Sequence, residues 1–385
     1  MHATWAPDGK GSACSPASPA PLRRPEKSLP SHPARRAVWP ICCAGVGNSR
    51  RRSPSRPPPA TAHRPRAVRP RPGADRPRMA TVESSVTTRH PAANSTEGGE
   101  RTLVGRIGPW QLVRLINESE LARVYVARPA DGAADAPASY VLKVLRKEWW
   151  RDTHAIEMQR RAAWVGRKVS HPHLLPVLSA GVEQPPFYTV SPKLEGRSLA
   201  RLLEQQRRLP LALTLWIARQ VAEALDALHT TARMIHADVK PANIVVGSDG
   251  HATLVDLGFV HTPGESRHWS QRPVYGTLNY MAPETLTSAL AASPQSDIYS
   301  LGVTLYETIC GCLPFIGRDA EHLLRQHREA RPECVRLRRP DAPKGIASLI
   351  HRMLAKDPLR RPESAAAVAE ELIRLEIECF AAQAA

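Results

Sequence analysis

The stretch MIHADVKPANIVV, residues 234–246, decides the fold and opens the question of function. Between apolar flanks it carries Asp238, Lys240 and Asn243 in the pattern H-x-D-x-K-x-x-N. The tripeptide DLG follows, and its Asp256 lies thirteen residues after Asn243. Each pattern alone is a weak signal, because acids in turns often only cap helices. Together, in this order and spacing, the two patterns are a strong signal of a functional loop.

The first 78 residues differ in composition from the rest of the chain. They hold 16 Lys and Arg against three acids, so +13 of the net charge of +17 lies there. Proline is frequent in this segment, and it joins neither helix interiors nor sheet ladders. We expect residues 1–78 to be a disordered basic tail and residues 79–109 to be a polar linker. There are two alternatives for the tail. It could tether the protein to nucleic acid, or it could be sequence upstream of a true translation start at Met79.

The seven cysteines argue against a disulfide framework or a zinc site, because they are scattered, odd in number and form no C-x-x-C pair. No run of 18 or more apolar residues could span a membrane, and the N-terminus lacks the apolar core of a signal peptide. A cytoplasmic location is therefore expected.

The periodicity of the remaining chain changes from strands to helices. From Trp110 the segments WQLVRLI, ARVYVARP and SYVLKVLR read like paired strands. Later segments such as LTLWIARQVAEALDALHTT and SDIYSLGVTLYETICG have helical spacing. This order predicts an α+β protein with a strand-rich lobe at about 110–193 and a helical lobe at about 194–380.

Residues from about 110 to 380 resemble the eukaryotic-like (Hanks-type) serine/threonine protein kinases, and among them the bacterial members. The likeness rests on HADVKPAN, DLG, GTLNYMAPE and DPLRRP. It implies the bilobal protein kinase fold, ATP and Mg²⁺ as cofactors, and a protein substrate with a serine or threonine acceptor. It also implies that Glu284 pairs with Arg361, that Asp297 braces the catalytic loop and that Thr277 faces the substrate.

The resemblance assigns chemical roles to single residues. Asp238 would accept the proton of the acceptor hydroxyl, and Lys240 would neutralise charge on the transferring phosphoryl group. Asn243 and Asp256 would hold Mg²⁺ through hard oxygen donors. Lys143 of YVLKVL would bind the α- and β-phosphates, with an ordinary surface lysine at a strand edge as the alternative.

The nucleotide would lie between the two lobes. The residues implied there are the apolar Val124, Val141 and Val245, Leu194 of the hinge SPKLEG, and Asn117 and Ser119 of the loop over the phosphates. Leu194 would offer both its N–H and its C=O to the base, and Ser191 takes the gatekeeper place. Apolar residues at such positions are more often core, so these assignments rest on the resemblance.

The glycines of the family's phosphate loop are absent. Asn117, Ser119 and Ala122 stand at the glycine positions of GxGxxG. Side chains at these positions crowd the approach of the backbone to phosphate and restrict φ. We therefore expect weaker or less well-ordered nucleotide binding.

The glutamate that pairs with Lys143 in the family is also absent. Counting back nine residues from His171 of SHPHLLPVL reaches Ala162 at its position. Glu157 lies five residues earlier, about 140° round a helix, so it faces elsewhere. Gln159 is about 60° away and is the better candidate to replace the glutamate.

Ala237 replaces the arginine that, in the family, receives a phosphate on the activation loop. We therefore expect no activating phosphate on Thr262, Ser266 or Ser270. Leu257 in place of phenylalanine is a mild change, because a large apolar side chain still packs there.

Two functions remain open at this point. An active kinase is favoured, because every directly chemical group is present and only positioning elements are missing. The lost glycines and glutamate support the alternative of a pseudokinase scaffold, which binds partners, with or without nucleotide, but turns over little or nothing. Nucleic-acid binding is not expected, since even the tail lacks the regularly spaced aromatic residues that stack on bases.

Overall fold

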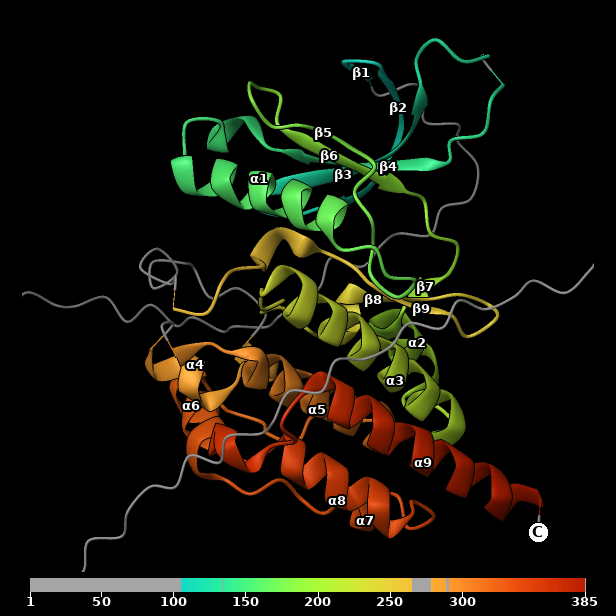
Figure 1. The fold of residues 1–385 in the computed structure, drawn as a ribbon, viewed down its shortest axis with the longest axis vertical. Coiled ribbons are helices and arrows are strands. Elements are labelled where there is room, and N and C mark those ends of the chain that lie inside the picture. Colours follow the sequence, from blue (N-terminus) through green and yellow to red (C-terminus); the bar gives the residue numbers. More distant parts are fainter. Residues whose placement is uncertain (1–104, 134, 265–277, 289–290, 385) are drawn as a thin grey trace, which may run out of the picture. The chain divides into compact units, whose positions relative to one another are not determined.

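The computed structural model describes residues 105–133, 135–264, 278–288 and 291–384. They form a lobe built on a sheet and a lobe built mainly of helices (Figure 1). The bilobal α+β fold expected from the sequence is thereby confirmed. The predicted tail, most of the predicted linker, Ser266, Ser270 and Thr277 lie outside the described residues.

The N-terminal lobe contains an antiparallel sheet of six strands within the described residues, in the order β1-β2-β3-β4-β6-β5. The strands are β1 (Gly105–Ile107), β2 (Trp110–Glu118), β3 (Ala122–Pro129), β4 (Tyr140–Leu145), β5 (Ser179–Gly181) and β6 (Tyr188–Pro192). The first of them lies in the range expected to be linker and pairs with β2. The short 3₁₀ helix η1 (Lys147–Trp149) leads into α1 (Thr153–Lys168), which runs along the sheet (Figure 1).

Strand alternation gives this sheet two different faces. Cross-strand neighbours share a face, so Val124 and Lys143 project to one side, together with Val141 and Ser191. Lys143 reaches Asp256 of the second lobe, so this face is turned towards that lobe. The opposite face carries the small apolar core of Leu112, Tyr125, Ala127, Leu142, Val144 and Val190.

The second lobe is mainly helical. Its α-helices are α2 (Leu199–Gln206), α3 (Leu211–Ala227), α4 (Pro283–Thr287), α5 (Pro294–Cys310), α6 (Ala320–Glu329), α7 (Val335–Arg338), α8 (Lys344–Met353) and α9 (Ala365–Ala384). Its shorter helical turns are η2 (Leu228–Ala232), η3 (Pro241–Asn243), η4 (Leu257–Phe259), η6 (Leu278–Tyr280) and η8 (Pro358–Arg360). A small antiparallel sheet of β7 (Arg197–Ser198), β8 (Ile244–Val246) and β9 (Ala252–Leu254) adjoins the segments HADVKPAN and DLG.

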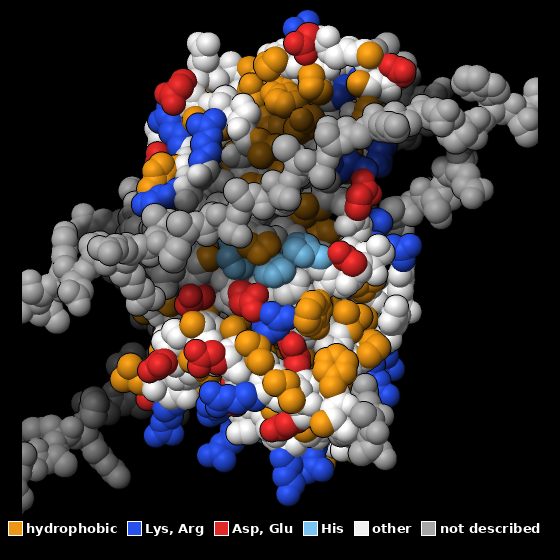
Figure 2. All heavy atoms as spheres, turned by 45° about the vertical axis from the view of Figure 1, so that its right-hand side comes forward, with side chains coloured by type: hydrophobic (Ala, Val, Ile, Leu, Met, Phe, Trp, Pro, Cys, Tyr) orange, Lys and Arg blue, Asp and Glu red, His pale blue; other side chains and the backbone are white. Residues whose placement is uncertain are grey.

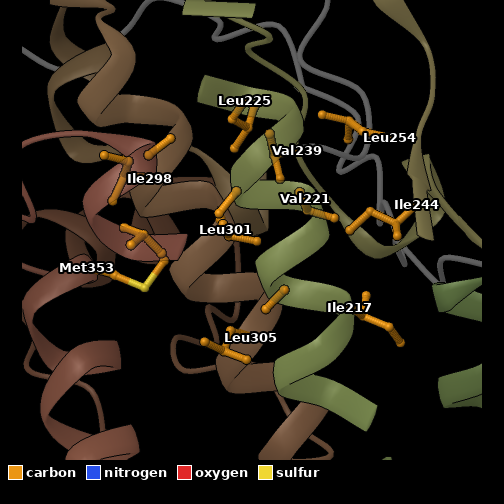
Figure 3. Packing of buried hydrophobic residues seen from close by; sticks show 14 of the residues in the cluster. Ile217, Val221, Leu225, Val239, Ile244, Leu254, Ile298, Leu301, Leu305 and Met353 are labelled. Atoms are coloured by element: carbon orange, nitrogen blue, oxygen red, sulfur yellow. The ribbon is translucent and has the colours of Figure 1, made fainter. Parts of the chain in front are cut away.

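The core of the second lobe is the contact between α3 and α5. Val221 and Leu225 of α3 face Leu301 and Leu305 of α5, with Met353 of α8 behind them (Figure 3). Helix α5 is buried around most of its surface, and its buried residues include the polar Ser296, Ser300 and Thr304 beside apolar side chains. Each of the apolar side chains of this contact is almost fully buried, and each such burial stabilises the fold by about 1.5–3 kcal/mol.

The loop that follows α1 makes hydrogen bonds between the two lobes. In this loop His173 O accepts a hydrogen bond from Leu254 N–H at 2.8 Å, and Leu175 N–H donates to Leu254 O at 3.0 Å. The ring of His173 lies between those of His171 and His251, with ring centres 5.5 and 4.7 Å apart. Histidine side chains gather at mid-height of the face shown in Figure 2. The loop therefore couples the end of α1 directly to β9.

The predicted ion pair between Glu284 and Arg361 is confirmed. Both guanidinium nitrogens of Arg361 donate to the carboxylate, at 2.7 and 2.8 Å. The guanidinium also stacks on Tyr299, 4.8 Å from the ring centre. A planar fork of donors suits a buried carboxylate, so this pair ties α4 to the segment before α9. Within the described residues, no helix combines the length and the apolar character needed to cross a membrane.

Candidate active site

The catalytic loop is held by a buried acid on α5. Asp297 accepts the N–H groups of His236 and Ala237, both at 2.8 Å, as the sequence led us to expect. Its other neighbour is His229, whose Nε2 lies 2.8 Å from the carboxylate. Burial would raise the pKa of Asp297, but the hydrogen bond and charge of His229 outweigh it and lower that pKa. The Asp297 carboxylate thus fixes the backbone before Asp238.

Ala237 has a φ of 62°, in the left-handed region that a residue with a Cβ seldom adopts. Such a conformation costs of order 1–3 kcal/mol and persists where the surroundings over-determine it. The hydrogen bond from Ala237 N–H to Asp297 supplies that constraint. The position therefore keeps its backbone shape without the arginine side chain.

Asp238 lies at the centre of the candidate site. It is 4% exposed, and its carboxylate accepts hydrogen bonds from Asn243 Nδ2 at 2.7 Å and from Lys240 Nζ at 2.8 Å. Asn243 Nδ2 also donates to the main-chain oxygen of Asp238 at 2.9 Å, so the amide oxygen of Asn243 points elsewhere. The structure brings these three predicted residues into direct contact.

Asp256 pairs with Lys143 across the two lobes. Its φ is 67°, and its carboxylate accepts Gly258 N–H at 3.1 Å. Burial would raise the pKa of Asp256, but the charge and hydrogen bond of Lys143 outweigh it and lower that pKa to about 2. A Cβ on Gly258 would lie 3.0 Å from the carboxylate and 3.2 Å from the ammonium, so the glycine leaves room for the pair.

Helix α1 contacts the lysine strand through an amide. Gln159 is 5% exposed, and its Nε2 donates to the main-chain oxygen of Lys143 at 3.0 Å. Gln159 thus reaches the expected residue, but it binds the carbonyl and not the ammonium. Ala162, at the position of the family's glutamate, packs in the apolar core of the second lobe together with Leu257. The ammonium of Lys143 therefore has Asp256 as its acidic partner.

The apolar residues expected around the nucleotide line the inter-lobe side. Val124, Val141 and Val245 are each half-buried, as residues bordering an open space would be. Val124 and Val141 project from the sheet face that carries Lys143, and Val245 comes from β8 of the other lobe. Leu194 is the second residue after the end of β6, at the crossing from one lobe to the other.

The hairpin between β2 and β3 is ordered by side chains in place of glycines. Ser119 Oγ accepts Ala122 N–H at 3.0 Å, and Ser119 N–H donates to Ala122 O at 2.8 Å. Asn117 pairs with Val124 in the strand ladder. Ser119 therefore closes the turn without a glycine, and the expectation of weaker or less well-ordered nucleotide binding stays a prediction. Trp149, which also binds this hairpin, was missed, and no sequence signal marks it.

The donor atoms suit a hard divalent cation. The carboxylate of Asp256 and the amide oxygen of Asn243 are oxygen ligands of the kind that Mg²⁺ prefers. No cluster of three or more His, Cys, Asp or Glu in the described part of the chain would hold a metal by itself.

Comparisons with known proteins agree with this geometry. A family model described as the protein kinase domain matches residues 120–373. Serine/threonine-protein kinase PrkC of Bacillus subtilis is 29% identical over 258 residues, which cover 67% of this chain and 39% of PrkC. Serine/threonine-protein kinase PknD of Mycobacterium tuberculosis is 32% identical over 262 residues, which cover 68% of this chain and 38% of PknD.

A third relative is the DNA damage-responsive serine/threonine-protein kinase RqkA of Deinococcus radiodurans. It is 32% identical over 268 residues, which cover 68% of this chain and 39% of RqkA. The chain thus spans about two fifths of the length of these curated relatives.

Proposed function

Because this chain belongs to the protein kinase family, among the bacterial Hanks-type serine/threonine kinases, we propose that it transfers the γ-phosphoryl group of ATP to protein hydroxyls. The observation that carries the proposal is the arrangement around Asp238. Its carboxylate lies within 3.0 Å of Lys240 and Asn243, on a backbone fixed by Asp297. A pseudokinase needs no such arrangement. The presence of this arrangement around Asp238 therefore supports catalytic turnover.

The chain's own residues divide the chemistry between them. Asp238 would orient a serine or threonine hydroxyl and take its proton as the oxygen attacks the γ-phosphorus. Lys240 would donate to the phosphoryl oxygens and balance their charge. Lys143 would bind the α- and β-phosphates, and Asn243 with Asp256 would hold Mg²⁺. The metal, when bound, supplies further neutralisation of the phosphate charge.

The nucleotide base would lie between the valines of the two lobes. Val124 and Val141 would cover it from the sheet and Val245 from β8, with Leu194 offering main-chain hydrogen bonds. Asn117 and Ser119 would contribute through the hairpin over the phosphates. These assignments are supported by the positions of the side chains on the inter-lobe surfaces.

We further propose that activation-loop phosphorylation does not control this enzyme. Ala237 offers no guanidinium to a phosphate, and its backbone is already held by Asp297. We place the activity in the cytoplasm. The four cysteines that the structure describes are free thiols, which supports a reducing compartment.

The test compares the full chain with its Asp238→Asn variant. Each is incubated with Mg²⁺, γ-labelled ATP and a generic basic protein as acceptor, and label on serine or threonine is measured. Asp341→Asn is the matched control, because this exposed aspartate lies outside the catalytic loop. Transfer that is lost only in Asp238→Asn supports the proposal.

Other outcomes would contradict it. Equal transfer by Asp238→Asn would refute the assignment of the base. No transfer by any preparation, together with a thermal shift on adding Mg·ATP, would identify a nucleotide-binding pseudokinase. No transfer and no thermal shift would identify a scaffold without nucleotide.

A further inference from the structure

The hairpin between β2 and β3 is anchored on one side by the segment that follows β4. Arg146 Nη1 donates to Ser119 O at 3.3 Å, and Arg146 N–H donates to Leu121 O at 2.9 Å. Between these two bonds, Trp149 Nε1 donates to Glu120 O at 2.9 Å. Three successive carbonyl groups are therefore bound from the same side.

The anchoring fixes the direction of the intervening N–H groups. In a planar trans peptide the N–H points opposite to the C=O of the preceding residue. Glu120 N–H and Leu121 N–H therefore point away from Arg146 and Trp149. Within the described residues neither N–H has a hydrogen-bond partner, whereas Ala122 N–H is used by Ser119. Two adjacent free N–H groups that point the same way are suitable donors for phosphate oxygens.

The ring of Trp149 has a second contact that holds it in place. It packs against the apolar cluster of Leu145, Ala155 and Phe187, beside Trp150. The indole donor is thereby fixed relative to β4, the strand that carries Lys143. The carbonyl of Glu120 and Lys143, the lysine proposed to bind phosphate, are thus both held in fixed positions relative to β4.

We propose that Trp149 and Arg146 are positioning residues that aim the N–H groups of Glu120 and Leu121 at the phosphates of the nucleotide. They do so by binding the carbonyl groups on the opposite face of the hairpin. In the family, glycines instead let the backbone of this loop adapt to the phosphates. This inference rests on the proposed function for the identity of the ligand. It does not depend on phosphoryl transfer taking place.

The test measures how much of the affinity depends on phosphate. Dissociation constants of Mg·ATP and of adenosine are determined by calorimetry on the full chain, and their ratio is compared between variants. Trp149→Phe removes the indole donor and keeps an aromatic ring in the cluster. We expect the preference for Mg·ATP over adenosine to fall about three- to ten-fold, the usual effect of losing one neutral hydrogen bond.

Trp150→Phe is the matched control. Trp150 Nε1 donates to Leu145 O at 3.0 Å, so this variant loses an equivalent bond from the same segment without touching the hairpin. We expect its preference for Mg·ATP to equal that of the unmodified chain. Arg146→Lys keeps the main-chain bond to Leu121 and loses the side-chain bond to Ser119, and we expect it to act in the same direction as Trp149→Phe.

Several results would overturn the inference. They are an unmodified chain that binds adenosine as well as Mg·ATP, an equal loss of affinity for both ligands in Trp149→Phe, or the same loss in Trp150→Phe. A fall confined to Trp149→Phe and Arg146→Lys supports it even when the unmodified chain transfers no phosphate. In that case the proposed kinase activity fails while the positioning role stands.

Discussion

Replacing His327 with glutamine is expected to make the protein more resistant to acid. His327 of α6 is 0% exposed, its Nδ1 lies 2.9 Å from Tyr299 Oη, and its ring centre lies 4.9 Å from that of Phe315. Burial and, after it, the charge of Lys356 lower the pKa of His327 from 6.5 to about 4. His327 is readily protonated in the unfolded chain, whereas the folded protein disfavours its protonation.

The size of the effect follows from the two pKa values. Between pH 6.5 and 4 the unfolded state binds more protons at His327 than the folded state, so the free energy of unfolding falls as the pH falls. The difference between the two pKa values lowers the free energy of unfolding by about 3 kcal/mol at a pH below both of them. At pH 5 the loss is about 2 kcal/mol. Domains have about 5–15 kcal/mol of stability in total, so this loss is a substantial fraction of it.

The assay is urea unfolding followed by tryptophan fluorescence, at about pH 7 and about pH 5. His327→Gln removes the titrating group and leaves an acceptor for the Tyr299 hydroxyl. The stability of the variant relative to the unmodified chain should rise by about 2 kcal/mol between the two pH values. His351→Gln, on the exposed side of α8, controls for the loss of a histidine as such. If the free energies of unfolding of His327→Gln and of the unmodified chain differ by the same amount at both pH values, the fold does not hold His327 neutral.

Three further predictions concern the ion pair, the active site and regulation. Arg361→Met should reduce the free energy of unfolding by about 3–5 kcal/mol, because it leaves the Glu284 carboxylate buried without its cation, and the double variant with Glu284→Gln should recover part of the loss in urea unfolding. Gly258→Ala should reduce kcat by about ten- to a hundred-fold through displacement of Asp256, and an unchanged kcat would contradict the tight fit described above. Thr262→Ala should leave phosphoryl transfer within about two-fold of the unmodified chain, since no arginine at the catalytic loop would receive a phosphate there; a large loss that parallels phosphorylation at this threonine would refute the regulatory proposal.

The catalytic loop was predictable because its residues are neighbours in the sequence. Asp238, Lys240 and Asn243 meet through two to five residues of chain, so their spacing already determines their contact. The pairing of Glu284 with Arg361 was also predictable, because the resemblance of GTLNYMAPE and DPLRRP to the family's motifs implies it. Local spacing and motif order carried these inferences.

The surroundings of Lys143 were only partly predictable. Helical angles placed Gln159 on the correct side of α1, but angles cannot tell whether an amide meets the ammonium or the carbonyl of a lysine. The anchoring of the hairpin could not be predicted at all. It depends on an indole 29 residues away from the carbonyl it binds, and an indole N–H at the end of a short 3₁₀ helix has no distinctive pattern.

The pair of Glu284 and Arg361 also has a consequence for synthesis of the chain. The two residues are 77 positions apart, so the carboxylate leaves the ribosome well before its partner. At about 5–20 residues per second the delay is roughly 4–15 seconds. During this time α3 has not yet met α9, and the apolar face that the last helix covers is still open. The helical lobe can therefore close only after nearly all of it has been translated, and until then this apolar face is exposed on the nascent chain.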